Sequence, residues 1–190
     1  MRDYNSKICF LLLAVFVTLT SCGQKSTHEE DLKYYTSIGL QMKDVVPKVQ
    51  NFWRQIKQGV LTAKQDETHK LDKAGVDSLK NYLSQIVNDL NDKIKVVSAL
   101  KETDQDLAFK TAIIAYLTET KTLQEKAIPK ILELLENGLD KINDEQKEAL
   151  KTFQTKGQEM QVKSKEIEDL SLTYKKKHNI TDEELVQYGL

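Results

Sequence analysis

The sequence predicts an all-α protein: an elongated antiparallel four-helix bundle with up-down-up-down connections and a short C-terminal helical turn. Three observations support this fold class. Apolar residues recur at three- and four-residue steps and do not alternate. The chain of 190 residues contains only 7 Gly and 2 Pro, fewer than the many turns of a β-sandwich or barrel require. The gaps between the periodic stretches are short, which favours antiparallel neighbours.

Four long periodic stretches and one short stretch define the predicted helices. Their expected ranges are 29–62, 74–101, 104–137, 144–177 and 182–188. The second is the most regular, with Val76, Leu83 and Leu90 on one apolar stripe. Polar and charged residues occupy the other faces, so each stripe must pack against another helix. At about 1.5 Å per residue, the bundle is expected to be roughly 40–50 Å long.

Residues at the boundaries agree with these ranges. Three pairs have the spacing of a helix N-cap and its partner three residues later: Thr27 with Glu30, Asn143 with Gln146, and Thr181 with Glu184. The run 103–106 predicts a similar start for the third helix. Gly138 and Asn179 stand where a left-handed C-cap is expected. The stretch 63–73 has the weakest pattern and is either a loop or a frayed helix end.

Both prolines lie inside predicted helices, Pro47 in the first and Pro129 in the third. A proline within a helix removes a backbone hydrogen bond and bends the helix axis. The pentapeptides around them, 45–49 and 127–131, are similar to each other. This similarity fits either an internal duplication of a two-helix hairpin or matched bends that let the helices wrap around each other.

Residues 1–21 have the organisation of a signal peptide that is cleaved on export. Arg2 and Lys7 precede an apolar run of about ten residues, half the length that a transmembrane helix needs. The run is followed by Leu19-Thr20-Ser21-Cys22. This tetrapeptide resembles the lipobox of bacterial lipoproteins, in which a type II signal peptidase cuts between Ser21 and Cys22. The resemblance implies that Cys22 becomes the N-terminus and carries lipid chains such as palmitate.

The chain is therefore expected to have four parts. These are the cleaved signal (1–21), the lipidated Cys22 with a polar tether (22–28), the helical bundle (29–178) and a short C-terminal helix (179–190). The expected location is the cell envelope. The outer membrane, at its periplasmic face or the cell surface, is favoured because Gly23 is not the Asp of the inner-membrane retention rule. As a whole, the chain resembles helical-bundle lipoproteins of Bacteroidetes and spirochaetes.

Composition and motifs argue against several classes of function. The 28 Lys+Arg and 29 Asp+Glu give a net charge of −1, which does not suit a nucleic-acid binder. Nucleophile-elbow and phosphate-binding motifs are absent, and the periodicity places no carboxylate on an apolar stripe, so we predict no enzyme. We interpret His28, His69 and His178 as solvent-exposed surface or cap residues. Without Glu-x-x-His or a cysteine-based site, neither a metal nor a cofactor is expected.

Adjacent aromatic residues offer candidate contacts for a partner. In Tyr34-Tyr35 and Phe52-Trp53, one residue of each pair is expected at the edge of the apolar stripe or outside it. Tyr34 and Trp53 are the candidates, and the alternative is a wide stripe that buries both residues of a pair. The basic run 175–177 either contacts anionic lipid or complements a helix C-terminus.

The principal functional hypothesis is a lipid-anchored, non-enzymatic bundle that binds a protein partner or has a structural role in the envelope. One alternative is a carrier or sensor of a small hydrophobic ligand, held between the kinked first and third helices. The other alternative is a surface-exposed adhesin or host-interaction factor.

Overall fold

The computed structural model describes residues 26–66, 69–104 and 108–190, and within these ranges it contains helices and no β-strand. The helices are α2 (His28–Gln65), α3 (Lys73–Ala99), α4 (Phe109–Lys126), α5 (Ile128–Asn137), the 3-10 helix η2 (Leu139–Lys141), α6 (Asp144–His178) and α7 (Asp182–Gln187). The prediction of an all-helical protein is confirmed for this part of the chain. The predicted signal peptide, its cleavage site after Ser21 and the lipidated Cys22 lie outside the described residues.

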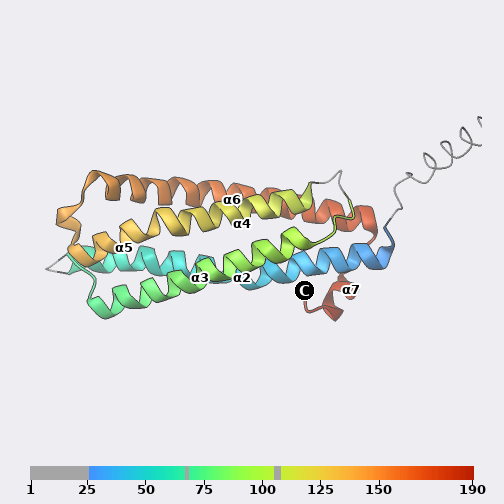
Figure 1. The fold of residues 1–190 in the computed structure, drawn as a ribbon, viewed down its shortest axis with the longest axis horizontal. Coiled ribbons are helices and arrows are strands. Elements are labelled where there is room, and N and C mark those ends of the chain that lie inside the picture. The colour runs from blue at the N-terminus through green and yellow to red at the C-terminus, as the bar shows by residue number, and fades with distance from the viewer. Residues whose placement is uncertain (1–25, 67–68, 105–107) are drawn as a thin grey trace, which may run out of the picture.

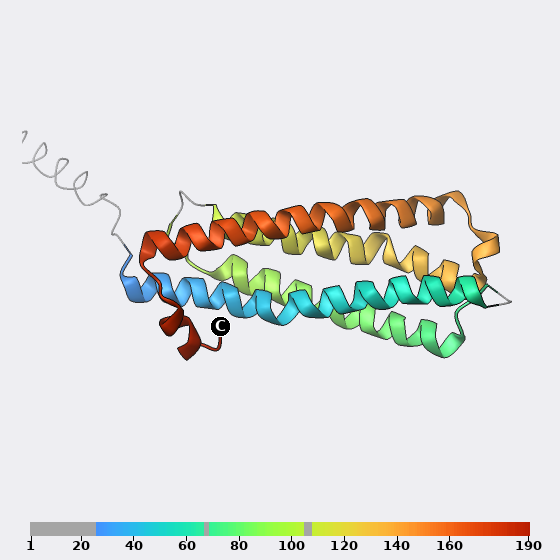
Figure 2. The ribbon, with the colours of Figure 1, turned by 180° about the vertical axis from the view of Figure 1, so that it is seen from behind.

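The long helices lie lengthwise beside one another and give an elongated molecule (Figure 1). α3 packs on α2 and α4, and α6 packs on α4 and α5. We call the end where α2 begins and α6 finishes the N-terminal end, and the opposite end the distal end. The connection between α3 and α4 also lies at the N-terminal end, where α7 turns back beside α2 (Figure 2).

Hydrogen bonds at the helix ends follow the sequence closely. The capping boxes predicted at Thr27, Asn143 and Thr181 are present, each with reciprocal bonds between the cap and the third helical residue. Asn179 has the predicted left-handed conformation at the end of α6, with a φ of 53°. Gly138 follows α5 with a φ of 106°, which a residue with a Cβ rarely adopts, but its ψ of 142° differs from the left-handed cap that was predicted. These caps fix where α2, α5, α6 and α7 begin or end.

The two prolines have different effects. α2 continues through Pro47 without interruption. At Pro129, by contrast, the predicted third helix is divided, because α4 ends at Lys126 and α5 starts at Ile128, with Pro129 in its first turn. A proline is tolerated in the first turn of a helix, where its missing N–H has no intrahelical partner to lose.

The start of the third predicted helix was also placed wrongly. The run 103–106 was expected to cap this helix, but α4 begins at Phe109 after Ala108, whose φ is 48°. The side chains of Thr103 and Asp104 have other partners instead, Tyr174 and His178 of α6. They join helices that are distant in the chain and do not cap their own.

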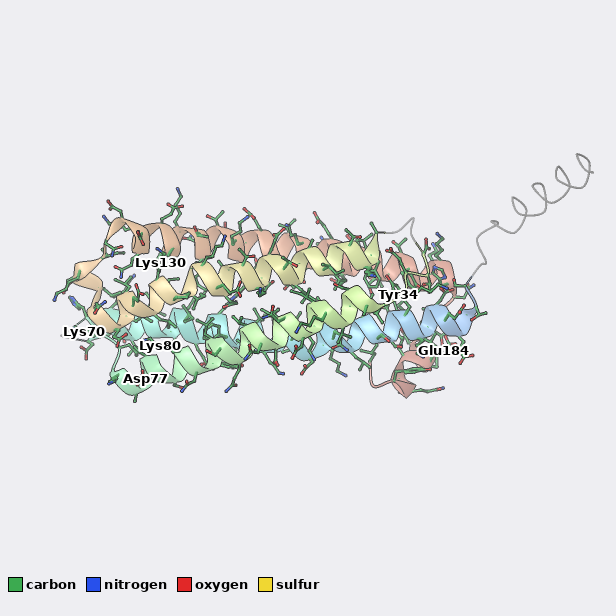
Figure 3. All side chains as sticks on the ribbon, viewed as in Figure 1. Tyr34, Lys70, Asp77, Lys80, Lys130 and Glu184 are labelled. Carbon is green, nitrogen blue, oxygen red and sulfur yellow. The ribbon has the colours of Figure 1, made fainter. Side chains whose placement is uncertain are left out.

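The core extends along the whole molecule. At the N-terminal end the rings of Tyr35, Phe109 and Tyr174 stack, with centroids 6.0 Å apart for Tyr35–Phe109 and 5.8 Å for Tyr35–Tyr174. Figure 3 shows Tyr34 at this end, with Glu184 of α7 nearby. Toward the distal end many of the buried side chains are aliphatic, including five of the ten residues of α5. None of the described helices combines the length and the apolar character needed to cross a membrane.

Candidate functional site

A groove lies between α2 and α6 in the distal half of the molecule. These two helices pack on each other less extensively than α2 packs on α3 or α6 on α4. The groove has a volume of about 1370 Å³ and extends from Val49 to Lys64 on α2. At about 1.5 Å per residue, this part of α2 is about 22 Å long. The opposite wall is α6 between Leu150 and Ser164.

The floor of the groove is apolar. Ile56 of α2 and Phe153 and Met160 of α6 lie there, together with Tyr116 of α4. Trp53, half-buried, meets Phe153 edge to face across the groove, with ring centroids 5.9 Å apart and planes at 87°. A smaller hollow of about 680 Å³ lies between α2 and α3, but its lining is mainly polar. The α2–α6 groove therefore combines depth with an apolar lining.

The rim of the groove is basic. Arg54, Lys57 and Lys64 line it from α2 and Lys151 lines it from α6, whereas no Asp or Glu is among its lining residues. None of these four cations is within ion-pair distance of a carboxylate in the described part of the chain. The rim on α6 otherwise carries amides. The groove therefore offers positive charge along α2 that no carboxylate of the described residues neutralises.

Many other lysines are paired. Lys48 of α2 lies 2.8 Å from Asp89, and Lys80 of α3 lies 2.6 Å from Glu136. The hydrogen bond to Glu136 raises the pKa of Lys80. The cations at the groove differ from these lysines because they have no carboxylate partner in the described residues. The chain as a whole has nearly equal numbers of acidic and basic residues.

Gly157 marks an open position in the wall of the groove. It lies within α6, where glycine is about 1 kcal/mol less favourable than alanine. A Cβ built at this position meets no atom of the described structure within 4 Å. Internal packing therefore gives no reason for a glycine here. A residue without a side chain does, however, leave room for another molecule to approach the backbone of α6.

A second polar feature, which we call the end cluster, joins the helices at the N-terminal end. It consists of Asp31, Asp104 and His178, with surrounding hydroxyl groups. Nδ1 of His178 lies 2.6 Å from Asp31 Oδ2, and Nε2 lies 2.9 Å from Asp104 Oδ2. The His178 side chain is only 12% exposed, and both carboxylates are buried. Each ring nitrogen of His178 therefore faces a carboxylate oxygen of a different segment.

Hydroxyl groups complete the end cluster. Ser26 donates to Asp31 over 2.7 Å, and the Tyr174 hydroxyl donates to the same oxygen over 3.3 Å. Burial opposes ionisation of Asp31, but hydrogen bonds from Ser26, Thr103 and His178 outweigh it and lower the pKa of the carboxyl group. Tyr174 also stacks on His178, with centroids 4.3 Å apart. Burial raises the pKa of the Tyr174 hydroxyl, so this group stays protonated.

The end cluster corrects two predictions. His178 was interpreted as a solvent-exposed cap, but it is mostly buried because it connects α6 to α2 and to the segment after α3. The periodicity was also expected to leave every carboxylate outside the apolar stripes, whereas Asp31 is buried in α2. A spacing of four residues links Asp31 to Tyr35 and His178 to Tyr174. Extending the apolar stripe of each helix by one turn would have identified both residues as candidates for burial.

The remaining predicted residues lie in different places. Tyr34 is 4% exposed and packs on Tyr174, so it belongs to the core and does not form a surface for a partner. Trp53 lies in the groove, and its indole N–H has no acceptor in the described structure. In the run 175–177, Lys175 lies 2.5 Å from Asp182 and Lys177 lies 2.6 Å from Asp104, so both fasten the N-terminal end.

His28 ties α7 to the start of α2. Its Nε2 lies 2.7 Å from Glu184 Oε1, and Nδ1 lies 3.0 Å from the carbonyl oxygen of His178. These contacts, the hydrogen bond to Glu184 first, raise the pKa of His28. His69 contacts Asp140 at the distal end. No group of three or more His, Cys, Asp or Glu side chains among the described residues is arranged to hold a metal ion.

The groove and the end cluster therefore differ in whether their polar groups are available to bind another molecule. The polar groups of the end cluster bind one another, whereas the groove presents apolar surface and cations that no described carboxylate pairs with. Comparisons with protein-family models, with curated proteins and with solved structures gave no match.

Proposed function

We propose that this chain is a lipid-anchored, non-enzymatic protein of the cell envelope that binds a protein partner through the groove between α2 and α6. The observation that carries the proposal is the combination of an apolar floor with four cations that lack ion-pair partners in the described residues. A purely structural bundle has no need of either feature. Exposed apolar surface bordered by polar groups is typical of an interaction site.

The position of the groove supports this proposal. We interpret the helices as an up-down-up-down antiparallel bundle in which α4 and α5 together form the third rod. Cys22, the proposed lipid anchor, precedes the start of α2 by only a few residues. Val49, where the groove begins, lies about 30 Å further along α2. An anchored bundle that stands away from the outer membrane would hold the groove clear of the lipid surface, where a partner can reach it.

The chemistry of the end cluster supports a non-enzymatic role. Both ring nitrogens of His178 contact carboxylates, so neither is directed at a hydroxyl group that could act as a nucleophile. Ser26 donates to Asp31, whose lowered pKa makes this carboxylate a weak base for activating the hydroxyl group. These groups join α2, α6 and the segment after α3, which is a structural role.

Site-specific photo-crosslinking in intact cells tests the binding surface. A photoreactive amino acid at Leu61, which is 52% exposed and lines the groove, is expected to crosslink one reproducible partner. The matched control is the same amino acid at Lys95 of α3, whose side chain is 79% exposed and lies outside the groove. Equal crosslinking at both positions, or none at Leu61, would contradict the proposal.

The anchor has an independent test. Labelled palmitate is expected to be incorporated into the natural chain and not into a Cys22→Ala variant. Unchanged labelling of the variant would contradict lipidation at Cys22. Protease treatment of whole cells then separates a surface-exposed adhesin from a protein of the periplasmic face, because only the former is released.

The apolar floor also favours a second candidate, the binding of a small hydrophobic ligand. The sequence predicts such a ligand between the first and third helices, which correspond to α2 and to α4 with α5. The groove lies instead between α2 and α6. Native mass spectrometry of protein purified from its own membrane distinguishes the candidates. A retained ligand of constant mass would favour the carrier, and its absence together with a crosslink at Leu61 would favour the protein partner.

A further inference from the structure

We infer that the partner which occupies the α2–α6 groove is an acidic amphipathic helix. This inference rests on the proposed function and adds the chemistry of the partner. Such a helix would place its apolar face on the floor of the groove and a row of Asp or Glu side chains against the basic rim of α2. Helix-in-groove binding is a recurrent mode of peptide recognition.

The dimensions of the groove suit a helix. Its length of about 22 Å along α2 equals that of about 15 helical residues. Both walls are helices, so a third helix can pack between them with its apolar side chains in the space over Phe153 and Met160. Leu61 and Val60 give this space an apolar edge on α2, and Gly157 allows a close approach to α6.

The distribution of charge favours a helix over a single acyl chain. Arg54 and Lys64 are ten residues apart on α2, which separates them by about 15 Å along the axis, and Lys57 lies between them. A fatty acid carries one carboxylate and needs cations only at one mouth of the groove. A helix with acidic residues three or four positions apart presents carboxylates along its whole length. The spacing of the cations along α2 therefore fits the carboxylates of an acidic helix better than the single carboxylate of a fatty acid.

Apart from Lys151, the opposite wall adds hydrogen-bonding groups without charge. Gln154, Gln158 and Gln161 of α6 line the groove at steps of three and four residues. They form a row of amides that faces the row of cations across the groove. An occupant with carboxylates on one flank and neutral polar side chains on the other satisfies both walls. Charge complementarity of this kind fixes the orientation of the partner as well as its affinity.

Binding of designed peptides to the purified chain, residues 22–190, tests the inference. Three helical peptides of about 15 residues share one leucine face and differ only in their flanks, which carry Glu, Gln or Lys. Trp53 is the only tryptophan of the chain, so its fluorescence reports occupancy of the groove directly. We expect the Glu peptide to bind about tenfold more tightly than the Lys peptide, with the Gln peptide between them.

Variants of the rim sharpen the test. Lys57→Glu/Lys64→Glu is expected to weaken the Glu peptide about tenfold and to strengthen the Lys peptide. Lys126→Glu/Lys176→Glu changes the net charge equally at exposed positions outside the groove and is expected to leave the order of the peptides unchanged. Gly157→Leu is expected to abolish binding of the Glu peptide, because the added side chain enters the groove, while circular dichroism shows an unchanged helix content.

Two results would overturn the inference. One is equal binding, or no binding, of the Glu and Lys peptides. The other is a change in Trp53 fluorescence on addition of oleate that the Glu peptide cannot reverse. The groove would then hold an acyl chain in preference to the acidic helix. A crosslinked partner at Leu61 combined with either result would leave the proposed function standing and reject only the acidic helix. Failure of the crosslink with success of the Glu peptide would reject the cellular partner instead.

Discussion

At the N-terminal end of the molecule, His178 lies between Asp31 and Asp104, and each ring nitrogen has a carboxylate partner. In the distal half, Arg54 and Lys57 border an apolar groove and have no such partner in the described residues. Buried charges destabilise a protein unless they are paired and hydrogen-bonded, whereas cations at a solvent-exposed rim remain hydrated. The charges of the end cluster therefore serve the fold, whereas the cations at the groove are available to bind another molecule.

The largest expected effect concerns packing in the core and in the groove. Phe52→Ala is expected to lower the free energy of unfolding by about 4 kcal/mol, because Phe52 is fully buried and leaves a cavity. Trp53→Ala is expected to cost only about 2 kcal/mol, since the larger ring is half-buried and the space it leaves opens into the groove. Urea unfolding of both variants measures the difference. Equal losses would show that the groove is packed as tightly as the core.

The second prediction compares the charges of the two regions. Asp31→Ala is expected to cost about 3 kcal/mol, because it leaves the buried His178 with one carboxylate and removes the acceptor of Ser26. Lys57→Ala at the groove is expected to change stability by less than about 0.5 kcal/mol. Thermal unfolding near neutral pH measures both. A loss at Lys57 as large as that at Asp31 would mean that the rim stabilises the fold.

The third prediction compares Gly157 in the groove wall with Gly59, which is buried in α2 against leucines of the core. Gly157→Ala is expected to stabilise the protein by about 1 kcal/mol, because the methyl group meets no described atom and alanine is a better helix former. Gly59→Ala is expected to give little or no gain, since its Cβ would lie 3.3 Å from a methyl group of Leu135. Urea unfolding measures both variants. No gain at Gly157 would indicate that the groove closes in solution.

The helices were predictable because their signals are local. Apolar spacing and the capping boxes at Thr27 and Asn143 act within a few residues of the chain, so α2 and α6 could be located from the sequence. The end cluster was missed because Asp31 and His178 are polar residues at stripe positions, and only tertiary contacts make their burial favourable. The groove could not be predicted at all, since it depends on how closely two helices approach that are remote in sequence.

The smallest effect expected involves the contact between His28 and Glu184. The pKa of His28 is raised above its ordinary value of 6.5, so the contact stabilises the docking of α7 fully below pH 6.5. This stabilisation is lost as the pH rises through the pKa of His28 in the folded protein. Amide hydrogen exchange of α7, corrected for the intrinsic rate, is therefore expected to become faster above pH 6.5.

In a His28→Gln variant this pH dependence should disappear, because glutamine does not titrate. His69→Gln is the matched control, since it removes a histidine–aspartate contact next to Lys70, which lies at the opposite end of the molecule from Glu184 of α7 (Figure 3). It should leave the pH dependence of exchange in α7 intact. If α7 in the His28→Gln variant kept the pH profile of the natural protein, another group of the N-terminal end would control its docking. The end cluster would then be the first candidate, because the helix that precedes α7 ends at His178.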